Sequence, residues 1–289
     1  MKTLLKFVVF AALVAGLVPL YQETRGVDPA QREAVTGKLR ELKALDTDWN
    51  VQVLRSKTGL NKHYDPVTQP ERVAMQIVDA ISPQLAAYDY RLKEQEQQLR
   101  EALMTKMDVI DRFKAQNAIL RNSVRYIPLA TTELKAKARE AGDAIPAKRA
   151  EMTTLAGNAD QVLIDTLKLE TSRDADSNRN LRQLVGTLVE RRGEYPPAVA
   201  ESFDTFLNHV ITISTQKERE EELLEELGKV PVLARIEALD AAFRTAFERA
   251  FAKHEKYTMM MYGYAAFLLA LLAFLLGRSS KPELQPAMA

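Results

Sequence analysis

The chain has 289 residues, 40 lysines and arginines against 39 acidic residues, and no cysteine. A formal net charge of +1 provides no global field that attracts nucleic acid, and the lack of cysteine excludes disulfides, thiolate catalysis and cysteine-ligated metals. With 46% hydrophobic and 27% charged residues, the composition is typical of a folded protein that has one large or two small cores.

The first element is a hydrophobic segment, residues 7–21, which carries no charge and follows Lys2 and Lys6. It is shorter than the roughly 20 residues that span a bilayer as a helix, and it contains Pro19. Two interpretations stay open, a transmembrane anchor or a cleaved signal peptide. Under both, the basic end stays inside, so we expect residues 1–6 to be cytoplasmic and residues 22–256 to be periplasmic.

The exported region is predicted to be helical throughout. Prolines and glycines fall between segments whose hydrophobic residues recur with a helical period. The β-branched run at residues 210–213 lies inside such a segment and is predicted to be helical as well. The expected helices cover residues 29–60, 70–82, 84–127, 129–141, 147–172, 176–193, 197–227 and 231–277.

The apolar residues form continuous stripes on these helices, which indicates burial against neighbouring helices of a bundle. The third helix, of about 44 residues, would be roughly 65 Å long, which exceeds an ordinary bundle. We therefore predict an all-α fold of long-helix bundles, with two stacked helical modules flanked by N- and C-terminal transmembrane helices. The main stripes are Val35, Leu39, Leu42, Trp49, Val53 and Leu60; Leu92, Leu99, Leu103, Ile110, Phe113, Leu120, Val124 and Ile127; and Ile236, Leu239, Phe243 and Phe247.

A turn-forming cluster, Tyr64-Asp65-Pro66, follows the first long helix, which also carries Arg55 near its end. Asp before Pro favours a turn, and an Asp side chain often caps a helix. The alternative is that Tyr64 and Asp65 line a cavity that faces Asn117 and Arg121.

Polar residues interrupt the apolar stripe of the third helix. At 100° per residue, Asn117 and Arg121 each lie within about 20° of Ile110, and Lys114 lies at the edge of the stripe. Burying such groups without partners costs a few kcal/mol, so they require protein, water or ligand partners. They form either a polar layer that fixes helix register, or part of a ligand pocket between helices.

The last hydrophobic segment, residues 257–276, is uncharged and long enough to cross a bilayer as a helix, and tyrosines lie near its start. We expect it to be a transmembrane helix followed by a short cytoplasmic tail, residues 277–289. The charged run before it, residues 217–226, is expected to be a solvated, ion-paired helix face.

Nothing in the sequence indicates catalysis or a metal site. The three histidines, His63, His209 and His254, are far apart and have no ligand partner at helical spacing. Nucleophile-elbow, phosphate-loop, zinc-protease and dinucleotide-binding motifs are missing from the sequence. We therefore expect no enzyme activity and no cofactor.

Two stretches resemble the double all-helical ligand-binding (DAHL) domain, the extracytoplasmic sensor module of certain bacterial membrane histidine kinases. Both are ordered as in that family and lie between the two hydrophobic segments. The resemblance implies an all-helical, bimodular periplasmic domain flanked by membrane helices. The matching residues are Leu54, Arg55, Gly59, Leu60, Tyr64, Asp65 and Pro66 in the first stretch, and Phe113, Lys114, Asn117, Ala118, Leu120, Arg121, Asn122 and Ser123 in the second.

Family members usually continue into cytoplasmic kinase domains, whereas this sequence has 13 residues after its last hydrophobic segment. We therefore expect a sensor or co-receptor in the bacterial inner membrane that has no output domain of its own and signals through a partner in trans, such as a histidine kinase. The alternative is a non-sensory helical scaffold or assembly factor of the cell envelope. The ligand would be a small molecule, and basic side chains would suit an anionic one; no nucleic acid is expected, and a homodimer stays open. The candidate ligand-binding residues are Arg55, Tyr64, Asp65, Lys114, Asn117, Arg121 and Asn122.

Overall fold

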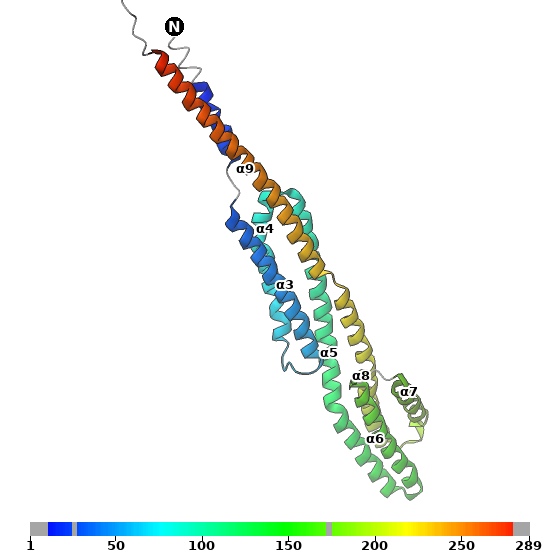
Figure 1. Cartoon of the computed structure of the whole chain (residues 1–289). Coiled ribbons are helices and arrows are strands. Elements are labelled where there is room, and N and C mark those ends of the chain that lie inside the picture. Colours follow the sequence, from blue (N-terminus) through cyan, green and yellow to red (C-terminus); the bar gives the residue numbers. More distant parts are fainter. Residues whose placement is uncertain (1–10, 25–27, 172–174, 280–289) are drawn as a thin grey trace, which may run out of the picture. The chain divides into compact units, whose positions relative to one another are not determined.

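The computed structural model describes residues 11–24, 28–171 and 175–279 of the chain (Figure 1). Within these residues it contains helices and no strand, which confirms the predicted all-α class. Residues 11–15 are helical, and the elements that follow are α2 (Leu17–Glu23), α3 (Pro29–Lys57), α4 (Asp65–Tyr88), α5 (Tyr90–Ala144), η1 (Pro146–Lys148), α6 (Arg149–Thr171), α7 (Ala175–Glu190), η2 (Arg192–Glu194), α8 (Pro197–Lys229) and α9 (Val232–Ser279).

Three expectations fall partly or wholly outside the described residues. These are the cytoplasmic residues 1–6, the start of the first hydrophobic segment at residues 7–10, and residues 280–289 of the expected tail.

Two predicted helix breaks are wrong, because Pro83 lies inside α4 and Pro128 lies inside α5. A proline inside a helix costs about 3 kcal/mol, since it has no N–H and its ring crowds the carbonyl one turn before. At Pro128 the helix continues because Ile127 and Leu134 are fully buried, and burying such a side chain contributes about 1.5–3 kcal/mol. Both proline rings are exposed, so they do not disturb the buried face.

The second long helix begins earlier than predicted, at Asp65 rather than at residue 70. The backbone N–H groups of Val67 and Thr68 donate to the carbonyl of Tyr64, which places Pro66 in the first turn. Proline is tolerated there because the first N–H groups of a helix have no intrahelical acceptor. Tyr64 therefore stands directly at the start of α4.

The chain divides into two compact units, and each is described here by itself. The first contains Met1–Asp46, Val73–Arg100 and Leu233–Ala289; the second contains Thr47–Arg72 and Glu101–Val232. The stacking of two modules stays a prediction.

The first unit is a bundle of α3, α4, the start of α5, and α9. Tyr88 of α4 meets the edge of Phe243 of α9, with ring centroids 5.5 Å apart, and its hydroxyl donates to Gln31 of α3. The guanidinium of Arg235 in α9 donates to Gln98 of α5 at 2.8 Å. The buried side chains follow the predicted stripes and include Val35, Leu39, Leu42, Leu92, Leu99, Ile236, Leu239, Phe243 and Phe247.

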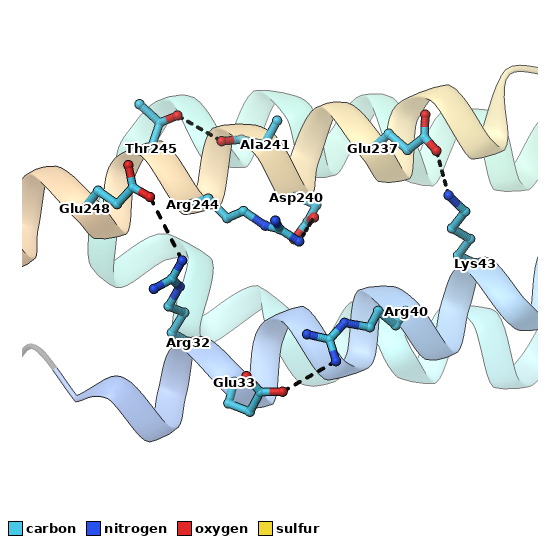
Figure 2. Close-up of polar contacts among 10 residues, drawn as sticks. All are labelled: Arg32, Glu33, Arg40, Lys43, Glu237, Asp240, Ala241, Arg244, Thr245 and Glu248. Carbon is cyan, nitrogen blue, oxygen red and sulfur yellow. Dashed lines mark hydrogen bonds and ion pairs between the residues drawn. The ribbon is translucent and has the colours of Figure 1, made fainter.

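Ion pairs on the surface of this unit join α3 to α9 in antiparallel register. Lys43 lies 2.7 Å from Glu237, and Arg32 lies 4.0 Å from Glu248 (Figure 2). These side chains are largely exposed, so each pair contributes at most about 1 kcal/mol. They do show which residues of the two helices lie opposite each other.

The second unit combines the end of α3, the start of α4 and most of α5 with α6, α7 and α8. Trp49 is fully buried and its indole N–H donates to the carbonyl of Val67 at 2.7 Å. The ammonium group of Lys106 lies 5.2 Å from the centre of the Trp49 ring and donates to Asn50. The predicted stripe residue Leu60 is an exception, because it is 68% exposed. A buried cluster joins α5, α6, α7 and α8 and includes Leu134, Leu155, Val162, Leu181, Phe203, Phe206 and Ile213.

One run of helix among the described residues, within Pro197–Phe274, is long and apolar enough to cross a membrane by length and composition, and its most apolar window is 6% buried. In α9 the exposed apolar side chains gather near the end and include Met259, Phe267, Leu269 and Phe274.

Candidate functional site

Asn117, on α5 in the second unit, is completely buried at 0% exposure. Its side-chain oxygen accepts a hydrogen bond from the hydroxyl of Tyr64 at 2.6 Å. Its side-chain nitrogen donates to a carboxylate oxygen of Glu220, on α8, also at 2.6 Å. One amide therefore joins the start of α4, the middle of α5 and the middle of α8.

Glu220 is the second buried polar group of the site and is 1% exposed. Its other carboxylate oxygen lies 3.4 Å from the ammonium group of Lys217, one turn earlier on α8. Removing a carboxylate from water is costly unless hydrogen bonds and an opposite charge compensate, and Asn117 and Lys217 supply both.

Glu220 corrects the expectation that residues 217–226 form a solvated face. It follows the buried residues Phe206 and Ile213 at spacings of seven residues, and Leu223 follows three residues later. This spacing is that of an apolar stripe. The stripe pattern therefore identifies Glu220 as a core position, although the charges around it suggest exposure.

Arg121 lies one helical turn after Asn117. Its guanidinium donates to the backbone carbonyl of Asn61 at 3.1 Å. Burial raises the pKa of the Tyr64 hydroxyl above its usual value of 10, the nearby Arg121 opposes this shift, and Glu220 reinforces it. The Tyr64 hydroxyl is therefore protonated at neutral pH and acts as the donor to Asn117.

The end of α3 places Asn61 beside Arg121. Gly59 has a φ of 73°, a left-handed conformation that glycine adopts without strain. Its N–H donates to Ser56 and the N–H of Leu60 donates to Arg55, which is the Schellman pattern that ends a helix. The Asn61 side chain then donates back to Ser56 at 3.1 Å, which fixes the turn.

The structure brings together three of the seven sequence-predicted residues, Tyr64, Asn117 and Arg121. To these it adds Asn61, Lys217 and Glu220, which the sequence reasoning did not nominate. We name these six residues the polar cluster.

The other four predicted residues lie around the polar cluster. Arg55 is exposed, and its backbone carbonyl accepts the hydrogen bond from the N–H of Leu60 at the end of α3. Lys114 forms an ion pair with Asp111 at 2.6 Å. Asp65 and Asn122 are exposed. Among the described residues, no side-chain hydrogen bond or ion pair joins these four to Asn117 or Glu220.

An acceptor on α8, near the polar cluster, has no donor among the described residues. The side-chain oxygen of Gln216 is buried, and no hydrogen-bond partner is found for it among the described residues. Gln216 lies one turn before Glu220, on the same face of α8. The helices α5 and α8 run antiparallel, because Arg112 bonds to Glu226 and Asn117 bonds to Glu220. In this register Gln216 lies at about the level of Arg121.

The chemistry of the polar cluster suits binding. It combines a guanidinium, an ammonium, a carboxylate, amides and a phenol, which recognise small polar molecules through directed hydrogen bonds. Among the described residues there is no group of three or more His, Cys, Asp or Glu side chains that could hold a metal ion.

The comparisons with known proteins identify the family of the chain. A family model described as the DAHL domain matches residues 27–258, which is most of the chain and includes the whole polar cluster. No curated protein and no solved structure matches.

Proposed function

Since the chain belongs to the DAHL-domain family, whose members are helical sensor-type domains, we propose that it is a membrane-anchored extracytoplasmic ligand-binding sensor or co-receptor. Its main domain lies in the periplasm and the chain is held in the bacterial inner membrane. It passes its signal to a partner in trans, such as a histidine kinase or another membrane signalling protein.

The observation that carries the proposal is the buried Asn117 bridge between Tyr64 and Glu220. A ligand that competes for the Asn117 amide or the Arg121 guanidinium changes the bonds that hold α8 against α5. A ligand shifts a conformational equilibrium only when it binds the two states unequally, and a broken bridge supplies that difference.

The chain connectivity supports a route for the signal. Glu220 lies nine residues before the end of α8, about 14 Å along the helix. Only Val230 and Pro231 separate α8 from α9, which contains the apolar run. In this proposal a slide of α8 acts on the start of α9 through the two-residue link, and helix shifts of about 1–2 Å are known from other switches.

The ligand chemistry follows from the groups that the polar cluster leaves available. Arg121 has donors beyond the one that Asn61 accepts, and these suit a carboxylate or phosphate oxygen. Gln216 offers a buried acceptor to an N–H or O–H group. A small anion that also carries a donor, such as a hydroxy acid or an amino acid, fits both.

The test is a thermal-shift panel on the full-length chain in mild detergent, with lactate, malate, glycine, glutamate, succinate and inorganic phosphate as probes. We expect at least one probe to raise the melting temperature of the wild type, and Arg121→Gln to abolish that rise. Arg125→Gln is the matched control, because Arg125 lies one turn further along α5 and is exposed. An equal rise in melting temperature in the wild type, Arg121→Gln and Arg125→Gln would show that the probe does not bind at the polar cluster.

A second function is favoured by a different feature of the polar cluster. Asn117, Glu220, Tyr64 and Arg121 already have protein partners, as in a layer that fixes helix register in a scaffold or assembly factor of the cell envelope. Loss of a unique oligomeric state in a variant of Asn117, with no probe response in the wild type, would favour this scaffold. A homodimer is compatible with both proposals.

A further inference from the structure

We propose that residues 11–24 are retained after export and lie antiparallel against the apolar end of α9 in the membrane, where Tyr264 locks the pair. The proposal rests on the membrane location proposed above and is independent of ligand binding.

The lock is a hydrogen bond from the Tyr264 hydroxyl to the backbone carbonyl of Leu13, at 2.8 Å. Gly16 allows the approach, because a Cβ atom placed there would lie 3.1 Å from the Tyr264 oxygen. Small residues permit close contact between membrane helices in the same way. The chain therefore has a glycine at the point where the tyrosine approaches.

The Leu13 carbonyl accepts two hydrogen bonds. The helix is interrupted at Gly16, whose N–H donates to this carbonyl at 3.1 Å, and the Tyr264 hydroxyl is the second donor. In hydrocarbon each backbone polar group must find a partner within the protein, because no water replaces it. A tyrosine hydroxyl in the bilayer requires a partner as well, and the second lone pair of the Leu13 carbonyl supplies it.

An ion pair marks the place where both segments leave the apolar region. The ammonium group of Lys253 lies 2.6 Å from the Glu23 carboxylate and 5.5 Å from the centre of the Tyr257 ring. Glu23 raises the pKa of Lys253 through a hydrogen bond and its charge. Charged and aromatic side chains in this arrangement are typical of a membrane surface.

The contacts share one antiparallel register. Residue numbers fall along the first segment as they rise along α9, from Glu23 with Lys253 to Leu13 with Tyr264. The same direction continues from α3, where Lys43 lies opposite Glu237 and Arg32 opposite Glu248 (Figure 2). Figure 1 shows α2, in blue, beside the later part of α9.

The depths of the two partners also agree. Leu13 lies eight residues before Tyr21, and Tyr264 lies seven residues after Tyr257, so both are about 11–12 Å along their helices from these tyrosines. If Tyr21 and Tyr257 lie at the same membrane surface, the two bonding groups meet at the same level. Removal of the first segment would leave the Tyr264 hydroxyl in lipid without this acceptor.

The first experiment measures the intact mass of the full chain, carrying a C-terminal tag, after extraction from bacterial membranes. We expect a mass that includes residues 11–24. A mass that begins after Tyr21 overturns retention, whatever the ligand panel shows. A retained segment combined with no ligand response would overturn only the proposed sensor function.

The second experiment tests the lock with Glu23→Cys/Lys253→Cys, in which the introduced cysteines are the only ones because the chain has none. A short bis-maleimide added to membranes reports their proximity, read by mass spectrometry. We expect Tyr264→Phe to lower the cross-linked fraction about threefold, the effect of a typical hydrogen bond between membrane helices.

The matched control is Tyr262→Phe, because Tyr262 is 67% exposed and belongs to the same helix. We expect it to keep the cross-linked fraction of the parent. Equal fractions in the parent, Tyr264→Phe and Tyr262→Phe overturn the lock.

Discussion

Asn117 and Glu220 are both buried, so neither exchanges its hydrogen bond for one to bulk water. We expect Asn117→Leu to lower the free energy of unfolding by about 2–4 kcal/mol, because it leaves the Glu220 carboxylate and the Tyr64 hydroxyl without their partner. Thermal or urea unfolding of the full chain, followed by circular dichroism, measures the change. Asn208→Leu is the control at an exposed asparagine of α8, and an equal loss there would refute a special role for Asn117.

Tyr64 makes the stability of the folded chain depend on pH. Burial raises its pKa in the folded chain above the unfolded value of 10. Its contribution to stability is therefore complete below about pH 10 and is lost as the pH rises through the folded pKa. We expect the absorbance titration of tyrosinate in Tyr64→Phe to lose one late step relative to the wild type.

The sequence located only part of the polar cluster. Asn117 and Arg121 interrupt an apolar stripe, and the structure places both beside Tyr64. Glu220 was missed because five other acidic residues within residues 217–226 suggest exposure. Asn61 was missed because Arg121 donates to its backbone carbonyl, a group that every residue type has.

At the scale of the helix, we predict that alanine changes stability in opposite directions at Gly59 and at Gly37. Gly59→Ala places a side chain at a φ of 73°, which costs about 1–2 kcal/mol. Gly37 lies inside α3, and a Cβ there meets nothing within 4 Å, so Gly37→Ala should stabilise the helix by about 0.5–1 kcal/mol. Melting temperatures that move in the same direction would contradict the assigned end of α3.

Pro128 provides a second test of a helix. We expect Pro128→Ala to stabilise the chain by about 1–3 kcal/mol, because alanine restores the backbone donor inside α5. Pro197→Ala should be close to neutral, since Pro197 is the first residue of α8 and its N–H would have no intrahelical acceptor. Unfolding of the two variants in urea separates these outcomes, and a destabilised Pro128→Ala would refute the cost assigned to a proline inside α5.

Helix type was predictable because the apolar period is strong over long segments, and most of the predicted stripe residues are buried. Helix ends at prolines were less predictable. A local signal at Pro83 or Pro128 competes with the burial of residues on both sides, such as Ile81 with Leu85 and Ile127 with Leu134, and burial prevails.

At the scale of the whole molecule, the chain has two compact units, and its polar cluster lies in the second, whereas its apolar helix end belongs to the first. Periodicity predicts helices but does not say how they divide into units. The second unit includes the end of α3 and the start of α4, which hold Asn61 and Tyr64.

The most direct test of this account is in-cell cross-linking of the full chain, followed by purification in mild detergent and identification of partners by mass spectrometry. We predict recovery of a histidine kinase or a chemoreceptor, with a yield that the Arg121→Gln variant alters and the Arg125→Gln variant does not. Recovery of secretion or wall-building proteins instead, unchanged by either variant, would contradict the sensor and identify the chain as a scaffold.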